Sequence, residues 1–296
     1  MRARHVLPVF AALGALLLTG CVDNSAPTGA ETTAPVANGV NADAVALLPQ
    51  DVADSGKLVI GTSPNYAPNE FKNDAGEPIG WAMEMSTALA ETLGLKPEFT
   101  IARFETIIPG IVGGSINAGV SSFTDNAERQ KQVDFVNYYV AGIQWASPKG
   151  KDVDPDNACG LTVAVQATTY QDTDEIPAKS EACVAAGKAA INKLPFDTQD
   201  AAANAVVLGQ ADAFTADSPV TLYAISKLDG KLQTAGETFD AAPYGIAVAK
   251  DSGMAEAVQA ALQSMVDDGS YTKILDAWGV ADGGLETITI NAGGKS

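Results

Sequence analysis

An arginine follows a run of small hydroxyl residues in the stretch "GVSSFTDNAERQKQVDF", residues 119–135. The guanidinium of this residue, Arg129, offers a planar pair of N–H donors that fits a carboxylate. The chain has a formal net charge of −18, so a general attraction for anions is not expected. By its spacing alone, Arg129 either holds one small anion or pairs with Glu128 or Asp134 on a surface helix.

The N-terminus predicts export and thereby limits the possible chemistry. Arg2, Arg4 and His5 precede the apolar run "VLPVFAALGALLL", which is too short for a membrane span and predicts a signal peptide over residues 1–20. Its removal takes away the single histidine, so the mature chain has no Ser-His-Asp triad, Cys-His pair or His-ligated zinc. No metal and no cofactor are expected. Acidity also argues against nucleic acid as a partner, because that affinity comes from clustered Lys and Arg.

The chain has three cysteines, one directly after the predicted signal peptide and two in the predicted second lobe. Cys21 ends "LTGC", which resembles the lipobox of bacterial lipoproteins, where the cysteine is acylated and anchors the protein to the membrane; an ordinary signal peptide containing a cysteine is the alternative. Cys159 and Cys183 form an even pair, which in an oxidising compartment predicts a disulfide worth about 3 kcal/mol. Free or metal-bound thiols are the less favoured interpretation.

The elements that must position Arg129 follow an alternating pattern. Residues 21–51 are rich in Ala, Thr, Asn, Pro and Gly and predict a lipid-anchored flexible tether. From residue 52 the chain predicts strand "KLVIGT", helix "WAMEMSTALAETLG", strand "KPEFTIA", helix "TIIPGIVGGS" and strand "INAGVSS". This β-α-β order is typical of an α/β fold with a parallel sheet covered on both faces.

The pattern restarts after residue 142, which predicts a second lobe. Strand "LTVAVQ", a helical region to Cys183 and strand "AAINKLPF" come first, and "DTQDAAANAVVLGQADAFTAD" repeats the rhythm of "FETIIPGIVGGSINAGVSS". Ser218 and Pro219 then open a helix. After strand "YGIAVAK", the last two predicted helices find a partner only if the chain returns to the first lobe. We therefore predict lobe 1 over residues 52–142 and 247–296, and lobe 2 over residues 143–246.

An ordered series of motifs carries a resemblance to a known family. The series runs from residue 61 to 219 and comprises "GTSPNYAPNEF", "GEPIGWAMEM", "FETIIPGI", "VSSFTDNAERQKQVDF", "VAVQATTY" and "ADAFTADSP". Over residues 52–280 the chain resembles the extracellular solute-binding proteins of bacterial ABC importers, family 3, which bind polar amino acids. The resemblance implies a periplasmic-binding-protein type II fold, with two lobes joined by two hinge crossings and an amino acid enclosed between them.

The resemblance also implies roles for individual residues. Arg129 would hold the ligand α-carboxylate and Asp217 the α-ammonium. The other implied contacts are the hydroxyl and backbone positions Ser122 and Thr124, the second-lobe turn with Thr168 and Thr169, the aromatic side chains of Tyr66 and Phe104, and Ser63 at the strand exit. Physical chemistry agrees, since a zwitterion needs an anion site and a cation site a few ångströms apart.

Other interpretations stay open at each of these positions. Tyr66 and Phe104 also suit core packing, Ser122 and Thr124 suit strand-end turns, and Asp217 suits the cap of the helix at Pro219.

Three departures from the family pattern bear on the ligand. Where binders of basic amino acids often carry an acid, this chain has Ser63, which favours a neutral polar or acidic amino acid. The usual turn glycine of the second lobe is Ala167, which leaves the local backbone conformation open, and Tyr170 stands where a smaller side chain is common.

We expect a monomeric binding protein, not an enzyme, that lies outside the cytoplasm on a lipid anchor and delivers its amino acid to the membrane subunits of an ABC permease. A sensor that reports to a receptor is one alternative. A carboxylate-dependent dehydratase on the same fold is another, with Glu70 as its acid, although an exposed loop position is the favoured interpretation of Glu70.

Overall fold

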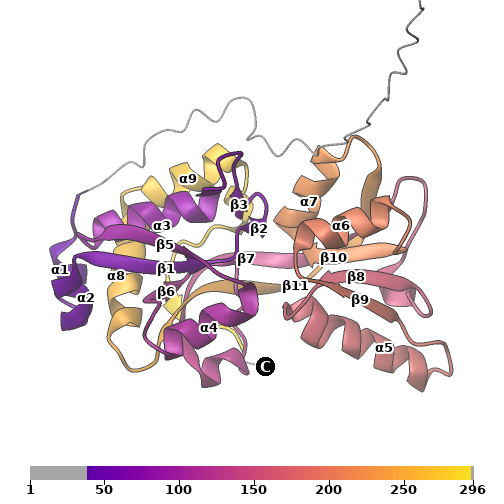
Figure 1. The fold of residues 1–296 in the computed structure, drawn as a ribbon, viewed down its shortest axis with the longest axis horizontal. Helices are drawn as coiled ribbons and strands as arrows, with labels where there is room; N and C mark the ends of the chain where they lie inside the picture. The colour runs from indigo at the N-terminus through magenta and orange to yellow at the C-terminus, as the bar shows by residue number, and fades with distance from the viewer. Residues whose placement is uncertain (1–38, 295–296) are drawn as a thin grey trace, which may run out of the picture.

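The computed structural model describes residues 39–294. Two lobes lie side by side and are joined by two long strands, β7 (Val133–Pro148) and β11 (Leu232–Ala249) (Figure 1). The predicted signal peptide over residues 1–20, the lipidation site Cys21 and most of the predicted tether lie outside the described residues. Within residues 39–294, no helix is both long and apolar enough to cross a bilayer.

The predicted tether is wrong for its last residues, which are helical. Helices α1 (Ala42–Val45) and α2 (Gln50–Ser55) occupy this stretch, and the side chain of Asn41 accepts a hydrogen bond from Ala44 N (3.0 Å) as an N-cap. Ala44 and Val52 are buried in the core of the first lobe. Composition does not predict these two helices, because small residues are common in loops and in short helices alike. Packing against the first lobe decides between the two.

One mixed sheet runs through both lobes, in the order β5-β1-β6-β11-β7-β10-β8-β9, with β12 added to β7. The predicted parallel pairing holds within each lobe, where β1 pairs with β5 and β6, and β8 with β9 and β10. The long strands β7 and β11 are antiparallel to each other, which the alternating pattern did not predict. The bounds are β1 (Lys57–Thr62), β5 (Lys96–Ile101), β6 (Ala118–Gly119), β8 (Thr162–Gln166), β9 (Asn192–Phe196), β10 (Ala213–Asp217) and β12 (Thr289–Ile290), with a separate small sheet of β2 (Asn65–Tyr66), β3 (Glu70–Lys72) and β4 (Pro78–Ile79).

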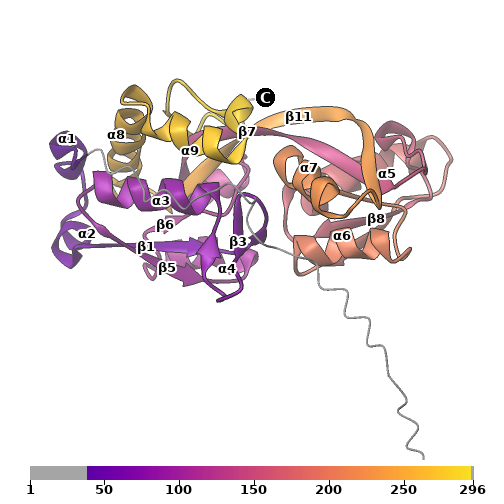
Figure 2. The ribbon, with the colours of Figure 1, turned by 90° about the horizontal axis from the view of Figure 1, so that it is seen from above.

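Four longer helices pack on the first lobe, and all four were predicted. They are α3 (Trp81–Thr92), α4 (Phe104–Val112), α8 (Met254–Asp267) and α9 (Ser270–Trp278). Figure 2 shows α8 and α9 beside α3, so the chain returns to the first lobe as expected. Their apolar faces form its main core, in which Trp81, Leu89 and Leu262 are fully buried.

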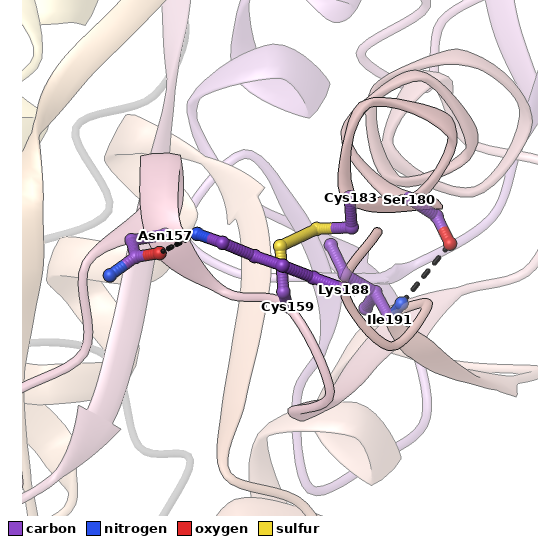
Figure 3. The surroundings of a disulfide bond; sticks show 6 residues. All are labelled: Asn157, Cys159, Ser180, Cys183, Lys188 and Ile191. Carbon is purple, nitrogen blue, oxygen red and sulfur yellow. Dashed lines mark hydrogen bonds between the residues drawn. A yellow bond between two sulfur atoms is a disulfide. The ribbon is translucent and has the colours of Figure 1, made fainter. Parts of the chain in front are cut away.

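The second lobe has three helices: α5 (Ile176–Ala185), α6 (Gln199–Val207) and α7 (Ser218–Lys227). The structure places Cys159 beside Cys183, on α5, with their Cα atoms 5.5 Å apart, a separation that suits the predicted disulfide. Nearby, Ser180 Oγ accepts a hydrogen bond from Ile191 N (3.1 Å), so a second contact on the same side holds α5 (Figure 3).

The predicted lobe boundaries, 142/143 and 246/247, fall inside β7 and β11. The β7–β11 pairing has register shifts between Ala235 and Ala242. Tyr244 and Ile246 pack in the core of the first lobe. We therefore keep two hinge crossings as the proposed division and place the second one near residues 235–242.

Candidate functional site

A cavity lies between the lobes, at the ends of strands from both. Eight of the nine predicted ligand-binding residues line it, and Thr168 stands just outside, where it faces Arg129 on another side. Residues far apart in the sequence are thus brought together. The cavity is lined by Ser63, Tyr66, Glu70, Phe104, Ser121, Ser122, Thr124, Arg129, Gln166, Thr169, Tyr170, Gln171 and Asp217.

Arg129 is held by backbone oxygens from both lobes. Its Nη1 donates to Thr124 O (2.9 Å) and its Nη2 to Thr168 O (3.1 Å), while its guanidinium lies 5.5 Å from the ring centroid of Phe104 and 5.6 Å from that of Phe123. Burial lowers the pKa of Arg129 to about 10, which leaves the side chain charged near neutral pH. A fixed cation with apolar neighbours is well suited to hold a carboxylate.

The surface ion pair considered for Arg129 does not form. Glu128 pairs with Lys131, and Asp134 accepts hydrogen bonds from Lys250 and Asn291. Both of the acids considered as surface partners are therefore engaged elsewhere, and the guanidinium turns toward the cavity.

Asp217 supplies the opposite charge from the end of β10. It occupies the N-cap position of α7 without a side-chain cap bond, so the capping alternative is not realised. Its Oδ2 accepts from the hydroxyls of Tyr66 (2.9 Å) and Tyr244 (2.7 Å), and its Oδ1 from Gln171 Nε2 (2.8 Å). Burial raises the pKa of Asp217, whereas these donors and Arg129 oppose that rise. Ser218, predicted as the cap, is instead the first residue of the helix.

Glu70 is buried at the cavity wall, and its expected exposed position is wrong. Its Oε2 accepts from Ser122 Oγ (3.0 Å), and its Oε1 has no hydrogen-bond partner within residues 39–294. Burial raises the pKa of Glu70 well above its usual range, and the negative charge of Asp217 adds to this rise. No local pattern indicates this burial, which arises from packing of the β2-β3 hairpin against the loop at Ser122.

Two predicted residues have left-handed backbone conformations, Ser122 with φ 51° and Thr168 with φ 65°. This conformation is strained for a β-branched residue such as Thr168, and such strain clusters at functional sites. It directs the carbonyl of Thr168 toward Arg129. The left-handed residue in this turn is thus Thr168, whereas the family resemblance places the usual turn glycine at Ala167.

Two further hydroxyl positions are tied to neighbouring loops. Ser63 N donates to Ser121 Oγ (3.1 Å), and Thr169 Oγ1 donates to Gln166 O (2.7 Å). These bonds fix the strand exits of the two lobes.

The two predicted aromatic residues differ in their surroundings. Tyr66 is buried and reaches from the first lobe to Asp217 in the second, so it does more than fill a core. Phe104 is half-buried and stacks on Phe123, with ring centroids 4.5 Å apart, beneath the guanidinium of Arg129. Phe104 can therefore contact both a ligand and the group that would hold it.

Three cavity residues escaped the sequence analysis, namely Ser121, Gln166 and Gln171, and Tyr170 was noted there only as a departure from the family pattern. Gln171 begins a π-helical stretch, Gln171–Glu175, that precedes α5. Such stretches are frequent at functional sites, yet they have no sequence signature that would have identified Gln171. Within residues 39–294, no group of three or more His, Cys, Asp or Glu is placed to hold a metal ion.

Comparison with known proteins gives consistent similarities. Residues 58–281 match the family model of bacterial extracellular solute-binding proteins, family 3. The arginine-binding protein ArgT of Corynebacterium glutamicum is 40% identical, over 83% of this chain and 82% of that protein. The ABC transporter glutamine-binding protein GlnH of Bacillus subtilis is 31% identical, over 77% and 82%. The solved structure of an ancestral arginine-binding protein bound to arginine superimposes with a TM-score of 0.69, at 31% identity, over 75% of this chain and 98% of that one.

Proposed function

Because the chain belongs to the bacterial extracellular solute-binding proteins, family 3, we propose that it captures a polar amino acid between its lobes and delivers it to an ABC importer. Arg129 holds the α-carboxylate and Asp217 accepts from the α-ammonium. Ser122, Thr124 and the Thr168-Thr169 turn complete the carboxylate side. The support is geometric, since Arg129 and Asp217 lie in one cavity and are close enough to affect each other's ionisation.

We further propose that the amino acid carries a cationic side chain, and the partner of that cation is Glu70. Arg129 and Asp217 neutralise the two charges of an amino-acid zwitterion, which leaves the buried carboxylate of Glu70 with an unused oxygen. A buried charge without a partner is costly, and a guanidinium or ammonium would remove that cost. The unpaired oxygen of Glu70 supports a cationic ligand more strongly than Ser63, in place of an acid, argues against one. A cationic ligand also agrees with the name of the relative ArgT, an arginine-binding protein.

Glutamine is the second candidate, and the raised pKa of Glu70 favours it. When Glu70 is protonated, the cavity is electrically balanced by Arg129 and Asp217, and a neutral amide fits better than a cation. The glutamine-binding relative GlnH is consistent with this possibility.

Titration calorimetry with arginine, lysine, glutamine, glutamate and cystine tests the proposal. We expect arginine or lysine to bind most tightly and Glu70→Gln to weaken that binding by a factor of about 10 to 100, as for a lost buried ion pair. Glu84→Gln is the matched control, because Glu84 is a half-buried acid of the same lobe that does not line the cavity. An unchanged arginine affinity in Glu70→Gln would refute the cationic assignment, and binding of none of these amino acids would refute the proposed function.

The dehydratase alternative also uses Glu70, since a carboxylic acid with a raised pKa at a cavity wall suits general acid catalysis. Incubation with prephenate-like substrates, followed by detection of product, tests it. Absence of product at high protein concentration rejects this alternative.

We place the protein outside the cytoplasm as a monomer, exported by the signal peptide over residues 1–20 and anchored through Cys21, with the Cys159–Cys183 disulfide formed there. A strain in which the gene for this protein is deleted distinguishes transport from sensing. Import predicts lost uptake of the amino acid during growth, whereas a sensor predicts normal uptake and a lost response.

A further inference from the structure

The C-terminal segment 289–294 lies against the loop that carries Arg129. It follows the part of the chain that matches the family, residues 58–281, and returns along the first lobe to β7. Its strand β12 pairs with β7 at Asn137 and Val136.

After β12, the segment binds β7 through a dense set of hydrogen bonds. Phe135 N donates to Asn291 Oδ1 (2.8 Å), and Asn291 N donates to Phe135 O (2.9 Å), so the two residues bind each other reciprocally. Asn137 Oδ1 accepts from Ala292 N (2.9 Å). These contacts fix the segment on the strand that immediately follows the Arg129 loop.

The segment then contacts the loop itself at Asp125 and Gln130. Asp125 is 2% exposed, and its Oδ2 accepts from Gly293 N (2.8 Å) and Asn137 Nδ2 (2.9 Å). Gln130 Nε2 donates both to Asp125 Oδ1 (2.6 Å) and to Gly293 O (2.7 Å). One buried carboxylate and one amide thus connect the two ends of the loop with the C-terminal backbone.

The backbones approach so closely that only glycine fits. A Cβ on Gly293 would stand 1.9 Å from Asp125 O, and one on Gly294, with φ +73°, would stand 2.7 Å from Ala127 N. The loop therefore accommodates the segment only with glycine at positions 293 and 294.

We infer that the C-terminal segment is a positioning element for Arg129. Thr124, whose carbonyl holds the guanidinium, precedes Asp125, and Gln130 follows Arg129 directly, so both ends of the loop are fixed beside the binding group. Without the segment, Asp125 loses a donor and Gln130 an acceptor, and the loop is free to take other conformations. The consequence for affinity rests on the proposed function, whereas the consequence for the loop does not.

Hydrogen exchange of the ligand-free protein tests the structural part. Gln130→Ala removes one hydrogen bond to the segment, at Gly293 O, and one within the loop, at Asp125 Oδ1, whereas deletion of residues 289–296 removes only the contacts made by the segment. The matched control Gln263→Ala also removes bonds to the C-terminal region, at Glu286 and Ile288, but on the side away from the loop. We expect about tenfold faster exchange in residues 122–132 for Gln130→Ala and for a chain lacking residues 289–296, and unchanged exchange there for Gln263→Ala. Unchanged exchange in the first two variants overturns the inference, whether or not an amino acid binds.

Calorimetry with L-arginine and L-glutamine tests the effect on binding. Gln130→Ala should weaken binding about tenfold in the otherwise unaltered protein and have no further effect in an Arg129→Ala background, because the segment acts through Arg129. A merely structural role would give the same loss in both backgrounds and would overturn the inference. Absence of binding to the unaltered protein would refute the proposed function and leave the exchange result to decide the role of the segment.

Discussion

At the scale of the residue, the proposed pairing of Glu70 with a cationic amino acid predicts that binding depends on pH. Burial raises the pKa of Glu70 well above its ordinary value, so the free protein keeps a proton there to a higher pH than an exposed glutamate would. A cation binds the ionised form, and binding therefore releases a proton. The affinity for arginine should be greatest above the raised pKa and should fall as the pH drops through it, by up to about tenfold per pH unit.

Calorimetry between about pH 5 and 8, in buffers of different ionisation enthalpy, measures both the affinity and the proton release. Glutamine is the internal control, because a neutral side chain does not require ionised Glu70. A pH-independent arginine affinity would contradict the assigned partnership, and so would a pH dependence retained in Glu70→Gln.

The individual residues of the site were predictable to different degrees. Arg129 and Asp217 could be predicted because each lies in a motif that sets its place relative to a strand end. Glu70 could not, because its burial depends on packing between β3 and a loop more than 50 residues away, at Ser122. Gln171 escaped for a similar reason, since its contact with Asp217 joins two distant parts of the second lobe.

At the scale of the element, the disulfide ties α5 to the loop before β8. Cys159 and Cys183 are 24 residues apart, and a closed loop of that size restricts the unfolded chain. The double substitution of both cysteines by serine should lower the free energy of unfolding of the second lobe by about 3 kcal/mol in the chain-entropy estimate. Urea unfolding followed by circular dichroism measures this change.

Two controls define the disulfide prediction. Reduction of the disulfide in the unaltered protein should lower the free energy of unfolding by the same amount. At low urea, the arginine affinity of the double variant should stay within about twofold of that of the unaltered protein, because neither cysteine lines the cavity. Equal stability of the oxidised protein and the double variant would contradict the prediction.

The elements themselves were largely predictable because hydrophobic spacing and turn residues mark them locally. The longer helices and the strands of the parallel pairs arise from such patterns, whereas the long strand β7 was not predicted as an element. What sequence spacing did not predict is the antiparallel pairing of β7 with β11, which joins residues about 100 positions apart, and the helical start at residues 42–55. Both depend on which surfaces meet in the folded chain, and that information is absent from local periodicity.

At the scale of the whole molecule, the lobes are joined across the cavity by the Arg129–Thr168 hydrogen bond and by two further contacts that differ in burial. At its centre, the hydroxyl of Tyr66 in the first lobe donates to buried Asp217 in the second. At its rim, Arg103 pairs with Asp197 at 3.1 Å, with both side chains exposed. Ligand binding and lobe closure are linked, because a ligand shifts the equilibrium only by its difference in affinity for the open and closed forms.

The two contacts should contribute unequally to closure. Tyr66→Phe keeps the ring and removes one donor to a buried carboxylate, which costs about 1.5–3 kcal/mol and should weaken arginine binding by a factor of about 10 to 100. Arg103→Ala removes only an exposed ion pair, which water and salt already screen, and should change the affinity less than about threefold.

Calorimetry gives the two affinities, and small-angle scattering gives the fraction of closed protein at subsaturating arginine. Because Tyr66→Phe shifts the balance toward the open form, it should need more arginine to reach the same radius of gyration. Equal effects of the two substitutions would contradict the prediction that the buried contact contributes more to closure than the exposed one.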